Sequence, residues 1–261
     1  MAELARKPDF PIPPNVDPMR VVDFDFFADR RYGAPARPHD ALITLRKEIG
    51  AGNQVGLLVL GEGFGSRRTA KDGPAWTLAA HKTLTGAMTD VVDKAGVAVL
   101  YYHQFRDNRF DSYDLLDLVK VIERVLGRHR PRAVYTHHPG DLNIDHRRTF
   151  EAVVTATRPM ADQTLQALFS IEVPSSTDWG AALGGDAFRP NWFVDVSETL
   201  ETKLALAGLY KTEVRDDPHP RSIAGLRERA RQWGRLSGLP AAEAFVLQRY
   251  VEGRQEGHVP H

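Results

Sequence analysis

The chain has 261 residues, 42% of them hydrophobic, and its 34 basic residues balance its 34 acidic ones. A neutral chain of this size can bury one continuous core and has no global attraction for nucleic acid or an anionic membrane, so we expect a small-molecule partner, no nucleic acid and no membrane. The absence of cysteine excludes disulfides and thiolate metal sites, so any metal must be held by His, Asp or Glu.

The first 20 residues are charged and rich in proline. They predict an extended arm, because each proline fixes φ and removes an amide donor. No stretch resembles a signal peptide, and none approaches the ~20 apolar residues of a membrane span. We therefore expect a cytoplasmic protein with one domain over residues 21–252 and a polar tail over residues 253–261.

Strand-like and helix-like segments alternate after the arm, as judged from the spacing of apolar residues. The expected strands are residues 21–27, 55–60, 97–102, 132–135, 165–173 and 192–196. The expected helices are residues 39–49, 76–95, 112–127, 146–158, 198–210, 222–236 and 241–250. Such alternation predicts parallel strands joined by right-handed helical crossovers. The expected fold class is α/β, a Rossmann-like three-layer α/β/α sandwich with a mostly parallel sheet.

A polar cluster between an expected strand and an expected helix holds three histidines and two aspartates, His137, His138, Asp141, Asp145 and His146. The carboxyl ends of strands are where α/β folds bind their ligands. A hydrogen-bonded loop, in which Asp145 caps the following helix, would explain part of the pattern. Three imidazoles and two carboxylates exceed what a cap requires, so we interpret the cluster as a functional site.

Two other loops carry polar side chains. Residues 61–66 are glycine-rich but lack the spacing of a dinucleotide-binding or P-loop motif, so a plain turn and a ligand loop are both open. Arg67, just beyond, has the donors to grip a phosphate or carboxylate. Asn108, Arg109 and Asp111 follow the third expected strand and either reach a ligand in the crevice or form a turn in which Asp111 or Ser112 caps the next helix.

Five blocks of sequence, taken in order, resemble the PIG-L/LmbE family of zinc-dependent N-deacetylases. They lie at residues 60–67, 107–111, 135–147, 172–180 and 218–222. The resemblance implies hydrolysis of the N-acyl group of an amino sugar or sugar nucleotide by metal-activated water. It also implies that His146 is one of the zinc ligands. A homo-oligomer is left open.

The first metal motif of that family, Ala-His-Pro-Asp-Asp-Glu after the first strand, is missing. The family takes a ligand His, a ligand Asp and the general base from it, but residues 28–41 contain no His-Pro-Asp-Asp. An ungapped register places residues 33–36 over the motif and abolishes all three. A second register places Asp40 over the ligand Asp, Arg37 over the ligand His and His39 over the base.

Two interpretations follow, because catalytic zinc needs about three protein ligands and a fixed positive charge about 4 Å from the ion costs several kcal/mol. In the first, the enzyme is active with Zn²⁺ held by His146, Asp40 and His39. Its general base is Asp29 or Asp145, assisted by His137 or His138, and its substrate-binding residues are Arg67, Asn108, Arg109, Asp111 and Asp141. In the second, the cofactor is lost and the chain is a pseudo-deacetylase that binds a sugar or a partner. A conversion to metal-independent chemistry through Arg37 or Arg68 is a third, weaker hypothesis.

Overall fold

The computed structural model describes residues 20–23, 53–63, 65, 74–161, 163–208 and 214–252. The strands are β1 (Arg20–Asp23), β2 (Val55–Gly61), β3 (Val99–Phe105), β4 (Ala133–Thr136), β5 (Ala167–Ile171), β6 (Trp192–Asp195) and β7 (Ala242–Tyr250). The helices are α2 (Pro74–Ala95), the 3₁₀ turn η4 (Phe110–Ser112), α3 (Leu115–His129), α4 (Ile144–Ala156), α5 (Ser176–Ala182), α6 (Leu200–Ala207) and α7 (Ile223–Ser237). None of the described helices is long and apolar enough to cross a bilayer.

The strands form two hydrogen-bonded groups that lie next to each other. In the first, β1, β2 and β3 are parallel, and in the second the order is β4-β5-β7-β6. The pair β4 and β5 is parallel, whereas β7 runs antiparallel to both β5 and β6. Because β1 lies beside β4, the order across the fold is β3-β2-β1-β4-β5-β7-β6. The predicted α/β class with a mostly parallel sheet is confirmed.

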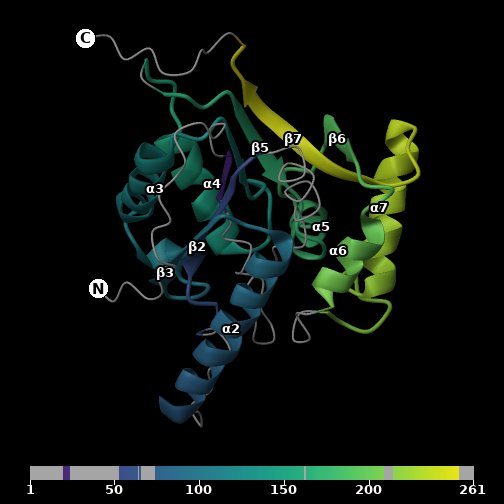
Figure 1. Cartoon of the computed structure of the whole chain (residues 1–261), viewed down its shortest axis with the longest axis horizontal. Helices are drawn as coiled ribbons and strands as arrows, with labels where there is room; N and C mark the ends of the chain where they lie inside the picture. The colour runs from purple at the N-terminus through teal and green to yellow at the C-terminus, as the bar shows by residue number, and fades with distance from the viewer. Residues whose placement is uncertain are drawn as a thin grey trace.

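Alternate residues of β2 point into different halves of the core, which gives the fold its layers. Leu57 and Val59 pack in a cluster with Met88 of α2 and Leu206 of α6. Leu58 and Leu60 belong to a second cluster with residues of α3 and α4. Since neighbouring side chains of a strand project to opposite faces, helices cover both faces of the sheet. Figure 1 shows α3 and α4 grouped together, apart from α6 and α7.

Most of the expected elements that fall on described residues are confirmed within a few positions. The helix expected over residues 241–250 is wrong, because these residues form β7. Ala and Glu at its start favour a helix, but pairing with β5 on one side and β6 on the other overrides that propensity. Helix α5, not expected, follows β5. The helix expected at 39–49, the strand beyond Asp23, the arm up to residue 19 and the tail at 253–261 lie outside the described residues.

Helix α5 packs directly on the loop that follows β4. A Cβ atom added at Gly180 would lie 2.1 Å from the carbonyl oxygen of Gly140 and 2.8 Å from the amide nitrogen of Leu142. Both are backbone atoms, so neither can move aside without displacing the loop. The amide of Leu142 also donates to the carbonyl of Ser176 at 3.0 Å. Position 180 therefore needs glycine for close approach of two backbones.

We expect Gly180→Ala to lower the free energy of unfolding by about 1–3 kcal/mol, the usual cost of forcing atoms into a packed contact. Gly127→Ala is the matched control, because a Cβ there, in α3, would meet nothing within 4 Å. That control should stabilise the protein by about 0.5–1 kcal/mol, since alanine favours a helix more than glycine does. Urea denaturation of both variants checks this, and a Gly180→Ala protein as stable as wild type would contradict the packing.

Charged side chains are buried where α6 and α7 meet β5 and β7. Lys203 lies 2.9 Å from Glu243, and both are almost completely buried. Glu172, just after β5, accepts a hydrogen bond from Nε1 of Trp233 and lies 3.8 Å from Nε of Arg229. Burial raises the pKa of Glu172 to about 7, although Arg229 and Trp233 act in the opposite direction. The folded protein therefore holds a proton here that the unfolded chain releases near pH 4.5.

This raised pKa makes stability fall as the pH rises. The contribution of Glu172 is fully present below about pH 4.5 and is lost as the pH passes through about 7, a change of roughly 3 kcal/mol at most. Replacing Glu172 with Gln should flatten the dependence of the free energy of unfolding on pH between 4.5 and 7, as measured by urea titrations. Glu201→Gln, at an exposed carboxylate paired with Arg227, should keep the wild-type slope. Equal slopes in the two variants would contradict the assignment.

Candidate functional site

Two buried imidazoles meet at the carboxyl end of β4. His137 directly follows the strand, and His146 lies in the first turn of α4. Both side chains are 0% exposed, and their rings stack with centroids 3.9 Å apart and planes 4° from parallel. The loop of residues 138–143 brings the first turn of α4 back against the end of β4. The structure thus brings two of the three predicted histidines together.

The ring of His146 is held by a carboxylate on one side. Its Nδ1 lies 3.0 Å from Oδ1 of Asp141. Since a carboxylate only accepts, a hydrogen bond across this distance requires a proton on Nδ1, and in the singly protonated ring the lone pair then lies on Nε2. Nε2 is buried and has no hydrogen-bond partner among the described residues. A histidine with one nitrogen bound to a carboxylate and the other available is typical of metal-binding histidines.

Asp141 is itself buried, and its carboxylate is fixed from several directions. It accepts hydrogen bonds from the amide of Asn143 at 2.8 Å, from Oγ1 of Thr177 at 2.8 Å and from Oγ of Ser176. Thr177 also accepts the amide of Val173 at 2.8 Å, so its one hydroxyl proton points to Asp141. Burial alone would raise the pKa of Asp141, but the charge that His146 carries when protonated, its hydrogen bond, and the hydrogen bonds from Ser176 and Asn143 outweigh burial and lower the pKa to about 2.

Asp145, next to His146, bonds to a different loop. Its carboxylate accepts from the amide of Asn108 at 2.6 Å and from the amide of Phe110 at 2.9 Å. Asn108 has φ of 55°, a left-handed conformation that asparagine adopts more readily than most residues with a side chain. The expected cap at Asp145 is wrong, because Oδ1 of Asn143 caps α4 by accepting the amide of Asp145. Asp145 therefore fixes the loop of residues 107–111 against α4.

The polar residues of that loop face outward. Asn108, Arg109 and Asp111 are exposed, and Asp111 lies in η4. The expected cap of the next helix by Asp111 or Ser112 is wrong, since α3 begins after Asp114 and Ser112 donates to the carbonyl of Arg109. The side chains at 108 and 109 are thus placed at the surface by a loop that Asp145 holds.

His138 turns to other partners. Its Nδ1 accepts the amide of Gly140 at 3.1 Å, and its ring packs edge-on against Phe188 with centroids 5.3 Å apart. Burial lowers the pKa of His138, although the charges of Asp141 and Asp186 act in the opposite direction. The ring is therefore a mainly neutral group beside the loop.

Four predicted site residues, Asp29, His39, Asp40 and Arg67, lie outside the described residues. Within the described ranges, no group of three or more His, Asp or Glu side chains is arranged to hold a metal ion. What the described residues offer a metal is the buried Nε2 of His146, with Asp141 behind it. A lone pair fixed in this way fits one ligand position of a zinc site.

Ser176 and Thr177 were not among the predicted site residues, although they lie in the block at residues 172–180 that resembles the family. They lie at the start of α5, and their hydroxyls donate to the carboxylate of Asp141. They therefore support His146 indirectly, through Asp141. The signal was present, because Ser175 followed three residues later by Asp178 is a capping-box pattern that marks the start of a helix. That pattern predicts α5, but only the fold brings it to Asp141.

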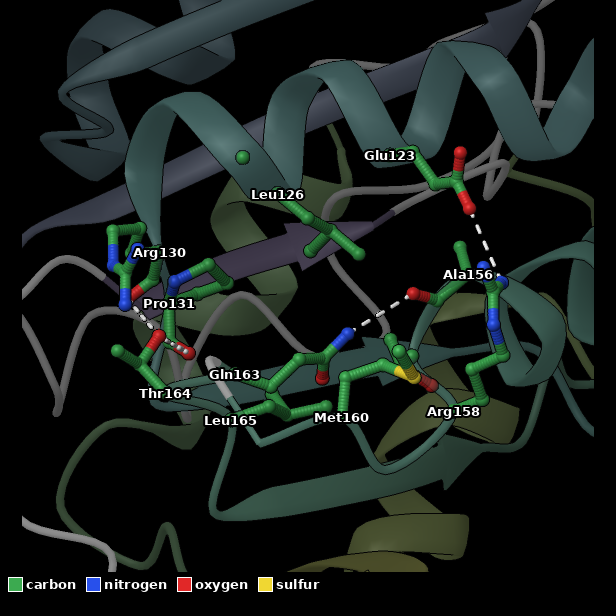
Figure 2. Close-up of a pocket in the computed structure, with 12 residues that line it drawn as sticks. Glu123, Leu126, Arg130, Pro131, Ala156, Arg158, Met160, Gln163, Thr164 and Leu165 are labelled. Atoms are coloured by element: carbon green, nitrogen blue, oxygen red, sulfur yellow. Dashed lines mark hydrogen bonds and ion pairs between the residues drawn. The ribbon is translucent and has the colours of Figure 1, made fainter. Parts of the chain in front are cut away.

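A cavity of about 300 Å³ lies away from this site. It is lined by the ends of α3 and α4 and by residues that follow α4, among them Arg158, Met160 and Gln163, as Figure 2 shows. Pro131 and Leu165, which line it, precede β4 and β5, whereas His137 follows β4, so the cavity and His146 lie at opposite ends of the strands. Arg158 is bonded to Glu123, and Gln163 to the carbonyl of Ala156. We therefore place the candidate site at His146 and not in the cavity.

Comparison with known proteins places this geometry in context. Residues 40–157 match the PIG-L family model, described as GlcNAc-PI de-N-acetylase. No curated protein matches the chain. The recognised resemblance to the PIG-L family is therefore confirmed by the family model over somewhat less than half of the sequence.

Solved structures match over most of the chain. The conserved protein TT1542 from Thermus thermophilus has a TM-score of 0.65 at 18% identity, covering 94% of this chain and 98% of its own. The N,N'-diacetylchitobiose deacetylase from Pyrococcus horikoshii, complexed with its inhibitor MPG, has a TM-score of 0.64 at 18% identity. The match covers 89% of this chain and 85% of the deacetylase. GalB, the 4-carboxy-2-hydroxymuconate hydratase from Pseudomonas putida, has a TM-score of 0.63 at 15% identity. The match covers 93% of this chain and 100% of GalB. The TM-scores show a shared fold, and at 15–18% identity the matches show the fold alone.

Removing the Asp145 carboxylate should release the loop of residues 107–111. In Asp145→Asn, one of the two amide donors loses its acceptor, which should lower the free energy of unfolding by about 1.5–3 kcal/mol. Asp114→Asn is the matched control, because Asp114 is exposed and makes no capping bond, and it should change stability by less than about 0.5 kcal/mol. Urea denaturation with amide hydrogen exchange at Asn108 and Phe110 checks this. Unchanged exchange at both amides would count against the assigned role.

Proposed function

We propose that this chain, which carries a PIG-L domain over residues 40–157, hydrolyses the N-acyl amide of an amino sugar or sugar nucleotide with the help of a divalent metal ion. The observation that carries the proposal is the buried ring of His146, whose Nδ1 is fixed by Asp141 and whose Nε2 has no hydrogen-bond partner among the described residues. A buried nitrogen without a partner is costly unless a ligand satisfies it. A metal ion would satisfy it.

In the proposed reaction, water adds its oxygen to the acyl carbon, the bond from that carbon to the sugar nitrogen breaks, and the products are a carboxylate and a free amine. A bound Zn²⁺ supplies polarisation of the amide carbonyl and a lowered pKa of water. His146 would hold it together with Asp40 and His39, the partners predicted from the sequence. Asp141 keeps the ring of His146 in one tautomer and one direction.

The roles of the acidic residues divide according to their contacts. Asp145 is fully used by the amides of Asn108 and Phe110, so we assign the general base to Asp29, the other candidate. Asp141 is buried beneath His146, so we assign it to positioning and not to substrate binding. We assign the assisting imidazole to His137, because its ring stacks on that of His146.

Substrate recognition falls to the exposed loop and to Arg67. Asn108 and Arg109 present amide and guanidinium groups, which suit sugar hydroxyls or a phosphate, and Asp111 adds an acceptor for hydroxyls. The loop is fixed by Asp145, so these groups are preorganised relative to α4. A sugar or sugar nucleotide is therefore the proposed partner, and the cytoplasmic location and a homo-oligomer remain predictions.

A second candidate function is a pseudo-deacetylase that binds a sugar without cleaving it. It is favoured by residues 28–41, which contain no His-Pro-Asp-Asp and carry Arg37 at a ligand position in one register. The fold alone does not decide, since structures of similar fold include a hydratase as well as a deacetylase.

Metal analysis and an activity assay on the same protein separate the two functions. We expect about one Zn²⁺ per chain and release of amine from N-acetylglucosamine, N,N'-diacetylchitobiose or a uridine-diphosphate-linked N-acetylglucosamine. His146→Gln should lose both the metal and at least about 100-fold in turnover, because one of about three ligands is removed. His129→Gln, which removes an imidazole of α3 that is hydrogen-bonded to Tyr101 of β3, should retain both the metal and the turnover.

Two outcomes would overturn the proposal. A metal-free protein that binds these sugars in calorimetry without releasing amine would establish the pseudo-deacetylase instead. An enzyme that turns over at the wild-type rate after His146→Gln would remove His146 from the mechanism.

A further inference from the structure

The start of α5 is a strained turn held by one carboxylate. Ser175, the cap residue, has φ of 77° and is fully buried. Its amide donates to Oδ2 of Asp178 at 3.0 Å, which completes a capping box. A left-handed conformation at a residue with a side chain persists only where its surroundings impose it. The next two residues are Ser176 and Thr177, so the position of their hydroxyls depends on this turn.

A residue far along the chain holds that carboxylate. Nη2 of Arg229, in α7, donates to Oδ1 of Asp178, 51 residues earlier in the sequence. Nε of the same guanidinium lies 3.8 Å from Oε2 of Glu172, and its carbon lies 5.6 Å from the centre of the Trp233 ring. The planar guanidinium thus spans both ends of the segment from Glu172 to Asp178, which a lysine ammonium is too compact to do.

We propose that Arg229 is a positioning residue for His146, and that it acts through Asp178 and the start of α5. Each contact in the series is present in the structure. Arg229 binds Asp178, Asp178 holds the amide of Ser175, and the following hydroxyls hold Asp141. Asp141 lies 3.0 Å from Nδ1 of His146. Arg229 touches neither the imidazole nor any reacting atom.

The contact of Arg229 with Asp178 is poorly placed to stabilise the fold by itself. The two side chains are 24% and 31% exposed, and partly exposed ion pairs contribute little to stability. Its effect on the position of α5 matters more than its effect on stability, because the hydroxyls of Ser176 and Thr177 must stay within hydrogen-bonding distance of the buried carboxylate of Asp141. A small shift of α5 therefore alters the ring of His146 more than it alters the free energy of unfolding.

The test compares Arg229→Gln with Arg227→Gln. Arg227 lies two residues earlier on α7 and pairs with Glu201 at the surface, so the control removes the same charge from the same helix without touching α5. The first readout is the ¹H–¹⁵N spectrum of the imidazole of His146, which reports which ring nitrogen carries the proton. The second is the affinity for Zn²⁺, measured by competition with a chromophoric chelator.

In wild type and in Arg227→Gln, we expect the proton of His146 on Nδ1. In Arg229→Gln, we expect a mixture of tautomers and a loss of Zn²⁺ affinity of about 3- to 10-fold, below the ~10- to 100-fold typical when a residue that contacts the ligand is changed. Arg229→Lys, which keeps the charge, should recover part of the loss. The double variant with Asp178→Asn should lose no more affinity than the more affected single variant, because both act in one series.

A single tautomer on Nδ1 in Arg229→Gln would overturn the proposal, and so would losses of affinity that multiply in the double variant. Thermal denaturation of all variants identifies any that fail to fold, and Arg229→Lys then carries the test. Only the Zn²⁺ readout rests on the proposed function. A wild-type protein that binds no Zn²⁺ would defeat that function, while the tautomer spectrum would still decide the role of Arg229.

Discussion

The contact between Asp141 and His146 is the interaction on which the candidate site depends. It joins a loop after β4 to the first turn of α4 and places both groups out of contact with solvent. A buried carboxylate is stable only if its acceptor sites are filled, and here an amide, two hydroxyls and an imidazole fill them. The result is an imidazole whose Nδ1 lies against a carboxylate and whose Nε2 has no hydrogen-bond partner among the described residues. A rigidly held imidazole with an unsatisfied nitrogen is typical of a ligand-binding site, because buried polar groups in a protein core are almost always hydrogen-bonded.

The two aspartates beside His146 show how one short loop organises its surroundings. Asp141 bonds inward to α5 and fixes the ring, whereas Asp145 bonds across to the amides of residues 108 and 110 and fixes the exposed loop. A parallel sheet brings these loops together because the carboxyl ends of its strands share one edge. The cavity between α3 and α4 lies at the other end of the strands, which is why it is not the candidate site.

Much of the fold follows from the sequence, because apolar periodicity and alternation of elements decide an α/β sheet locally. The predicted cluster at His137 and His146 also came together, since the short loop between the end of a strand and the start of a helix keeps these two residues close to each other. Residues 242–250 could not be predicted as a strand, because their alanines favour a helix and only pairing with β5 and β6 selects β7. Nor could the sequence show that Thr177 meets Asp141 or that Asp145 serves another loop, since these contacts join segments about 35 residues apart. Such contacts are set by packing, with Gly180 permitting the approach.

The role of the contact between Asp141 and His146 is tested by the imidazole ¹H–¹⁵N spectrum of His146 in the wild-type protein, recorded before and after the addition of one equivalent of Zn²⁺. We expect the Nε2 resonance to shift on addition of the metal while Nδ1 keeps its proton, because Asp141 holds one nitrogen and leaves the other to the ion. A spectrum in which Zn²⁺ leaves both nitrogens unchanged, or binds at Nδ1, would contradict it.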